Sequence, residues 1–220
     1  MNCPFKSLMP QPVSPIHPPD DYARFAWAYD ALTAPFLDST RRSVLAALSP
    51  ARHSPVLDLC CGTGRLLAML RAAGFGVAGV GLSPAMLARA RAVVPGVWLH
   101  QEDAARTSFP DGAFNAATIA FALHEKPEPV RLAILAEARR VLAPGAPLLV
   151  CDYAAPQDAA SRLGLTLARL PERAAGAEHY HLYCDYLARG ATEGLLTRHG
   201  EPYERLDRFL YGAAGLYRVG

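Results

Sequence analysis

The sequence predicts an α/β fold in which helices cover both faces of a mostly parallel, seven-stranded sheet. Three observations support this prediction: five short apolar runs alternate with helical segments, an acid and two glycines follow the first run, and two more apolar runs close the chain. Such alternation is typical of a Rossmann-like, doubly wound domain, and 220 residues suffice for one. We expect a proline-rich arm at 1–19 and a single domain at 20–220, whose site is capped by N-terminal helices and a small C-terminal helical insert.

The composition excludes several classes of protein. Hydrophobic residues make up 51% of the chain and charged residues 19%, as in soluble globular proteins, and a net charge of +2 predicts no nucleic-acid partner. No apolar run is long enough for a transmembrane segment or a signal peptide. The five cysteines include no CxxC pair, so we expect no disulfide framework, no metal site and a cytoplasmic setting.

The N-terminal segments precede the predicted sheet. Residues 1–19 contain many prolines and few periodic apolar positions, which indicates an extended arm. From Asp20 an aromatic and alanine-rich pattern predicts helix. We expect this helix to break near Pro35 and to resume over Leu37–Leu48, where the apolar spacing gives one buried face.

The remaining elements are predicted from the period of their apolar residues. The predicted strands are Ser54–Cys60, Gly76–Val80, Gly96–His100, Phe114–Phe121, Ala146–Tyr153, Tyr203–Leu210 and Gly215–Val219. The predicted helices are Arg65–Ala73, Pro84–Val93, Pro129–Leu142, a segment from Pro156 to about Leu170, and one from Glu178 to His199 with an interruption at Gly190. Gly212 suits a hairpin between the last two strands.

The end of the first strand carries the most informative residues. Asp58 lies near that end and can accept hydrogen bonds from a cationic group. Gly62 and Gly64 follow in the turn and, because they lack a Cβ, let a ligand approach the backbone closely. The helix that begins there offers free N–H donors. Since doubly wound sheets bind ligands at this edge, the segment predicts a cofactor site.

This segment resembles the first motif of the class I S-adenosylmethionine-dependent methyltransferases, in which an acid precedes a Gly-x-Gly-x-Gly loop. The resemblance implies S-adenosylmethionine as cofactor, S-adenosylhomocysteine as its product, and Asp58, Cys60, Gly62 and Gly64 as binding residues. Cys60 departs from the motif, because glycine is usual at its position. A nicotinamide-binding turn would need a third glycine where Leu67 stands.

The end of the second strand departs further from the family. The resemblance implies cofactor contacts from Gly81, Leu82 and Met86, with core packing as the alternative for Met86. The family usually places an acid at the position of Gly81 to hold both ribose hydroxyls, and glycine can hold neither. Either backbone or water holds the ribose, or the ligand is not the ordinary cofactor. An NADP site would need a basic residue beside Gly81, and Leu82 and Ser83 do not supply one.

The next two strand ends resemble the segments that hold the nucleoside and border the acceptor. In the family's adenine loop an acid accepts from the exocyclic amine and the next backbone N–H reaches a ring nitrogen, which implies these roles for Asp103 and Ala104. The segment Ile119–Glu125 is similar to the part of ubiquinone/menaquinone-type methyltransferases that borders the sulfonium. This similarity implies that Phe121 forms a wall of the site.

Three side chains are candidates for a catalytic acid or base. His124 could act as an acid or base because the unperturbed pKa of histidine lies near neutrality, although a hydrogen-bonding role is an equal alternative. We expect His179 near the acceptor, and Tyr29 belongs with Tyr22 to an aromatic patch that resembles the family's cofactor cover and would favour a sulfonium cation. The pair His179 and His181 also suggests a metal, but without a nearby acid or cysteine cluster we expect none.

The resemblance implies an enzyme that moves the methyl group of S-adenosylmethionine to a small-molecule acceptor by in-line displacement. Two alternatives stay open. One is an S-adenosylmethionine-binding protein without methyl transfer, suggested by Gly81 and by the absence of an unambiguous base. The other is an NADP-dependent oxidoreductase. The sequence leaves the acceptor, the methylated atom and the choice between monomer and homodimer open.

Overall fold

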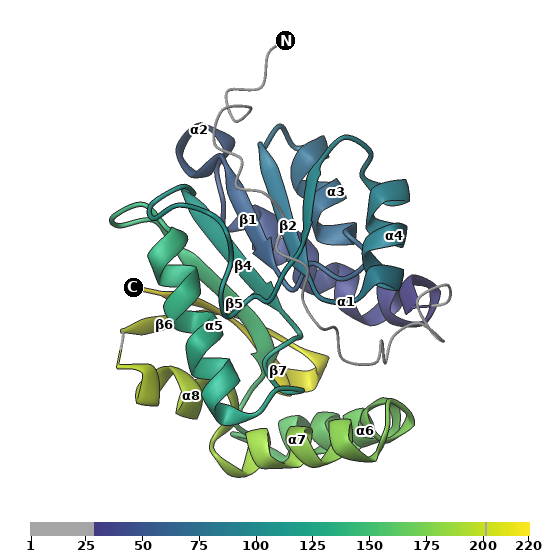
Figure 1. Ribbon diagram of the computed structural model, residues 1–220. Coiled ribbons are helices and arrows are strands. Elements are labelled where there is room, and N and C mark those ends of the chain that lie inside the picture. Colours follow the sequence, from purple (N-terminus) through teal and green to yellow (C-terminus); the bar gives the residue numbers. More distant parts are fainter. Residues whose placement is uncertain (1–28, 201) are drawn as a thin grey trace.

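The computed structural model describes residues 29–200 and 202–220, so the predicted arm and Tyr22 lie outside the described residues (Figure 1). Seven strands form one sheet in the order β3-β2-β1-β4-β5-β7-β6. The strands are β1 (Val56–Leu59), β2 (Val77–Gly81), β3 (Trp98–Gln101), β4 (Ala116–Ala120), β5 (Leu148–Tyr153), β6 (Tyr203–Phe209) and β7 (Ala214–Val219). All neighbouring pairs are parallel except those that involve β7. The predicted mostly parallel, seven-stranded sheet is confirmed.

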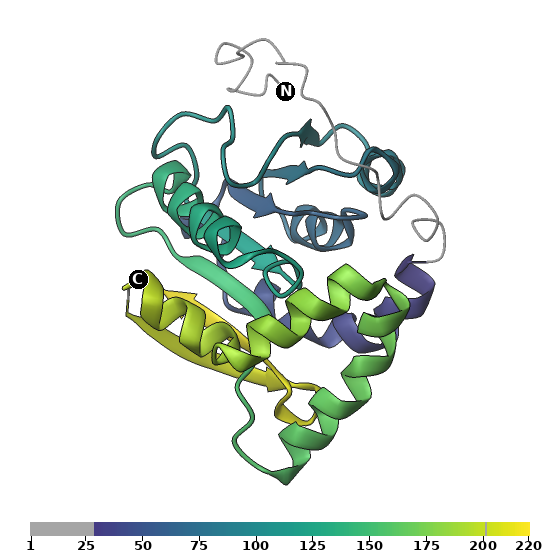
Figure 2. The same cartoon turned by 60° about the horizontal axis from the view of Figure 1, so that its bottom comes forward.

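Helices cover both faces of this sheet (Figures 1 and 2). They are α1 (Tyr29–Ala46), α2 (Pro50–His53), α3 (Arg65–Ala72), α4 (Pro84–Val93), α5 (Glu128–Val141), α6 (Ala159–Ala174), α7 (Ala177–Ala188) and α8 (Ala191–His199). The buried side chains of α5, α7 and α8 pack on one face, and those of α1 and α3 on the other. Within the described chain no helix has both the length and the apolar character needed to cross a membrane.

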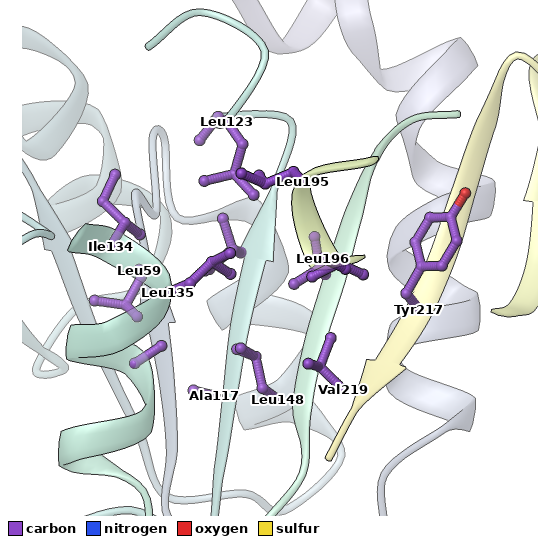
Figure 3. Close-up of a cluster of buried hydrophobic side chains, with 14 of the residues drawn as sticks. Leu59, Ala117, Leu123, Ile134, Leu135, Leu148, Leu195, Leu196, Tyr217 and Val219 are labelled. Atoms are coloured by element: carbon purple, nitrogen blue, oxygen red, sulfur yellow. The ribbon is translucent and has the colours of Figure 1, made fainter. Parts of the chain in front are cut away.

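Alternation along each strand decides which face a residue serves. On β1, Leu57 and Leu59 belong to the apolar cluster beneath α5 and α8, whereas Val56 belongs to the cluster beneath α1 and α3. Figure 3 shows part of the first cluster, where Leu59 lies with side chains from α5 and α8. Asp58 therefore faces the side of the sheet that carries α1 and α3.

The C-terminal hairpin is also confirmed. Strands β6 and β7 pair antiparallel and are joined by a 3₁₀ turn over Leu210–Gly212. Because β7 inserts between β5 and β6, it adds the antiparallel strand of the sheet. Helices α6 and α7, which precede the hairpin, lie side by side at one end of the sheet (Figures 1 and 2).

Two predicted helix boundaries are wrong, and each lies beside a proline. Helix α1 continues through Pro35, and α6 continues through Pro171 to Ala174. An internal proline costs a helix about 3 kcal/mol. Contacts beyond each proline offset this cost: Asp38 pairs with Arg65 of α3, and Glu172 makes buried hydrogen bonds. These tertiary contacts could not be predicted from local sequence.

Candidate cofactor site and a buried polar cluster

A cavity of about 400 Å³ lies at the carboxyl ends of β1, β2 and β4. Cavities that hold small molecules in proteins measure about 300–1,000 Å³, so this one can take a ligand. All predicted cofactor residues that the structure describes, except Gly64, line it. These lining residues are Asp58, Cys60, Gly62, Gly81, Leu82, Met86, Asp103, Ala104 and Phe121. Residues from four strand ends of the sequence thus converge on one cavity.

The two glycines after β1 serve different purposes. Gly62 has φ +52°, and a Cβ built on it would meet no atom within 4 Å, so this backbone is open to the cavity. Gly64 has φ +75°, and its Cβ would lie 2.9 Å from the Cβ of Ala90 on α4. Gly62 therefore lets a ligand approach, whereas Gly64 lets α3 and α4 pack closely.

Two non-glycine residues in the cavity wall adopt left-handed backbone conformations. Cys60 has φ +66° at the end of β1, and Phe121 has φ +50° at the end of the neighbouring β4. Such conformations cost an L-residue about 1–2 kcal/mol and concentrate at functional sites. Cys60 thus has a backbone conformation that glycine adopts more readily than cysteine.

Asp58 is the buried acid of the cavity. The residue is only 3% exposed, and its carboxylate accepts a 2.8 Å hydrogen bond from the hydroxyl of Thr118. Burial raises the pKa of Asp58 to about 7, although Thr118 and the Arg41 guanidinium lower it in part. A cationic ligand group would favour the ionised carboxylate and lower this pKa.

Helix α1 brings a positive charge into the same cavity, which the sequence analysis missed. Arg41 and Thr40 line the cavity. Asp38 holds the helix in place, because it accepts hydrogen bonds of 2.8 and 2.6 Å from Arg65 of α3 and one of 2.7 Å from Arg41. The pattern of residues 37–48 predicted a buried helical face but gave no sign that the helix crosses the ends of distant strands.

Crowding does not explain the missing acid at Gly81. A Cβ built on Gly81 would lie 3.4 Å from the Cδ2 of Leu87 and 3.9 Å from the Sγ of Cys61, which are ordinary contacts. Its φ is not positive, so a side chain would also cause no backbone strain there. The fold can therefore accept an aspartate at this position.

The predicted catalytic histidines come together, but outside the cavity lining. His124 and His179 have ring centroids 5.6 Å apart and share a buried cluster with Asp152 and Glu172. Glu125, which does line the cavity, approaches His179 at 3.5 Å and so connects the two regions. The side chain of Tyr29 lies outside the described residues. The catalytic roles of His124, His179 and Tyr29 stay predictions.

Burial and charge act against each other in this cluster. Burial lowers the pKa of His124, but the Asp152 and Glu172 carboxylates raise it more, to well above its usual value. Burial raises the pKa of Glu172, but hydrogen bonds from His124, His179 and Tyr153 bring it far below its usual range. The cluster therefore favours a protonated His124 beside an ionised Glu172.

The central part of the chain is similar in sequence to known methyltransferases. Residues 56–145 match the methyltransferase domain family. The demethylmenaquinone methyltransferase of Thermus thermophilus is 42% identical over 122 residues, which is 53% of this chain and 54% of that protein. The one from Beutenbergia cavernae is 36% identical over 138 residues, covering 62% of this chain and 57% of its own. The chain spans little more than half the length of these relatives.

Solved structures extend the likeness to nearly the whole chain. A SAM-dependent methyltransferase from Thermotoga maritima, described as a possible histamine N-methyltransferase, superposes with a TM-score of 0.63 at 19% identity and covers 90% of this chain and 97% of its own. The magnesium protoporphyrin IX methyltransferase of Synechocystis, solved with S-adenosylhomocysteine bound, gives 0.59 at 18% identity, with 82% and 81% covered. At such identities the likeness establishes the fold.

Fold and sequence together define the class. Residues 56–145 match the methyltransferase domain family, and the chain has the class I S-adenosylmethionine-dependent methyltransferase fold. Within that class it resembles the menaquinone-type methyltransferases, as its motifs indicated.

Proposed function

We propose that the chain binds S-adenosylmethionine in the cavity at the ends of β1, β2 and β4 and transfers its methyl group to a small-molecule acceptor. One observation supports this more than any other: a buried acid, a buried arginine and an open glycine backbone face the same cavity of about 400 Å³. A ligand with an aminoacyl group carries both charges that these groups would match.

The residues present fit this cofactor. Asp58 can accept from its ammonium group, Arg41 can bind its carboxylate, and the open backbone at Gly62 leaves room beside the helix start. Asp103 and Ala104 also line the cavity, and we propose that they contact adenine, as the family resemblance implies. A pyrophosphate would instead meet the buried acid Asp58, which disfavours the NADP alternative.

The chain's contribution to the reaction is to orient and to exclude water. When bound, the cofactor supplies an electrophilic methyl group on a sulfonium centre. Phe121 and Met86 offer apolar walls, and α1 closes over the loop after β1 because Asp30 accepts a 2.7 Å hydrogen bond from Thr63. Holding two reactants in line can by itself supply much of the rate enhancement.

The acceptor is proposed from the relatives alone. The relatives from Thermus thermophilus and Beutenbergia cavernae are demethylmenaquinone methyltransferases, so a demethylated quinone is the first acceptor to test. His124 and His179 remain candidates for moving the acceptor's proton only through Glu125, because neither lines the cavity. We also propose a cytoplasmic setting; the cysteines at 60, 61, 151 and 184 are free thiols.

Isothermal titration with S-adenosylhomocysteine tests the proposal. We expect one site, with affinity increased about tenfold by Gly81→Asp, because a charge-assisted hydrogen bond contributes about 1.5–3 kcal/mol. Gly81→Asn is the matched control: it has the same shape without the charge and should gain less. No binding by the wild-type chain would contradict the proposal, and tight binding without turnover on any acceptor would favour a binding protein.

A further inference from the structure

Three side chains from separate elements converge near α6 and α7. His124 follows β4, Glu172 belongs to α6 and His179 to α7, and one donor atom of each lies within 4.8 Å of the others. The Oε2 of Glu172 is 2.6 Å from the Nε2 of His179 and 3.5 Å from the Nε2 of His124. Two imidazole nitrogens are thus directed at one carboxylate oxygen.

The other polar atom of each side chain already faces a partner. The Nδ1 of His124 lies 2.7 Å from Asp152, the Oε1 of Glu172 accepts a 2.7 Å hydrogen bond from Tyr153, and the Nδ1 of His179 is 3.5 Å from Glu125. In a metal-bound state, a carboxylate beside each Nδ1 would hold the proton there and leave the Nε2 lone pair for the ion. This outer arrangement accompanies histidine ligands in metal sites.

The charges of the cluster balance with or without a metal ion. Asp152 is fully buried and also accepts backbone N–H groups of Leu123, His124 and Tyr153. In the metal-free chain a proton on each histidine Nε2 makes the contacts with Glu172 favourable. Metal ligation would release these two protons, and one divalent cation would replace their charge in a site where His124 is 4% and Glu172 7% exposed.

We propose that His124, Glu172 and His179 bind one divalent transition-metal ion of the zinc class. Imidazole and carboxylate ligands suit such ions, whereas magnesium and calcium prefer oxygen ligands alone. Three protein ligands leave a coordination position open, as in catalytic zinc sites. The side chain of His179 is 19% exposed, which offers an entry path from the surface.

This site differs from the sequence-based expectation of no metal. That expectation considered His179 with His181, two positions away, and found no cluster of acids or cysteines near them in the sequence. In the fold, α6 packs against α7, and this packing brings the carboxylate of Glu172 within hydrogen-bond distance of the imidazole of His179. The site is also distinct from the proposed cofactor cavity, which none of the three ligands lines.

Titration of the chelator-treated full chain with Zn²⁺ tests the proposal without cofactor or acceptor, so its outcome does not depend on methyl transfer. We expect one Zn²⁺ per chain and no binding of Mg²⁺. Zn²⁺ binding should weaken at least tenfold in each of the variants His124→Gln, Glu172→Gln and His179→Gln. Glu125→Gln should also weaken it about tenfold, because the Nδ1 of His179 loses the carboxylate beside it. His181→Gln, on the exposed face of the same helix, should bind as the wild type does.

Two further measurements keep the test decisive. Circular dichroism establishes that each variant is folded, and His179→Gln, at the most exposed ligand, carries the test if a buried substitution unfolds the chain. Co²⁺ in place of Zn²⁺ should give a visible absorption band that His179→Gln changes. Absence of Zn²⁺ binding by the folded wild type, or binding that survives all three ligand substitutions, would overturn the proposal and leave a protonated histidine pair.

Discussion

The raised pKa of Asp58 predicts a specific pH dependence of stability. Burial gives Asp58 a pKa of about 7 in the ligand-free folded chain, against 3.8 for an ordinary aspartate such as one in the unfolded chain. The stabilising effect is therefore fully present below the unfolded pKa of 3.8 and is lost as pH rises through about 7. Between pH 5 and the folded-state pKa of about 7 the pH rises by about two units. Each unit lowers the free energy of unfolding by about 1.36 kcal/mol. We expect the free energy of unfolding to fall by about 2–3 kcal/mol.

Urea unfolding at several pH values measures this change, and Asp58→Asn isolates it. The asparagine keeps an oxygen for the hydroxyl of Thr118 but does not titrate. The difference in unfolding free energy between the two proteins cancels every other group. A difference that stays constant to within about 0.5 kcal/mol from pH 5 to pH 8 would refute the reasoning, because the buried carboxylate would then titrate normally.

Four further outcomes follow from the geometry. S-adenosylhomocysteine should bind more tightly at pH 8 than at pH 6 and release a proton near pH 6.5, seen as a buffer-dependent heat; a heat independent of the buffer would contradict the role of Asp58. Gly64→Ala should cost about 2–4 kcal/mol of stability by urea unfolding, since the new Cβ meets Ala90 at positive φ, and a neutral effect would contradict the packing role. Gly62→Ala should cost only about 1–2 kcal/mol but weaken ligand binding at least tenfold, and equal affinity would place the ligand elsewhere. Arg131→Met should cost about 3–5 kcal/mol, because Arg131 is fully buried against Asp185, Glu128 and two carbonyls; a change under about 1 kcal/mol would argue against that network.

Local sequence was sufficient to predict most helices and strands and the cavity residues that lie at the strand ends. Asp58 lies near the end of a predicted strand, Gly81 and Asp103 follow two others, and parallel strands bring their carboxyl ends to one edge. Their convergence could therefore be predicted without knowing any long-range contact. The same periodicity predicted the order of strands and helices almost throughout.

Long-range packing could not be predicted in this way. Arg41 enters the cavity only because Asp38 ties α1 to Arg65, 27 positions further along the chain. The separate role of Gly64 depends on Ala90 of another helix. In both cases the sequence shows a helix but not the surface against which it packs.

The sequence alone determined the fold class, the motif residues and the departures at Cys60 and Gly81, since these depend on residue type and on spacing within one βα unit. Tertiary structure decided that α1 supplies a cation to the cavity and that His124, Glu172 and His179 form a separate buried cluster. The physical reason is that charge pairing and burial depend on distances between segments far apart in the chain, which no local pattern records.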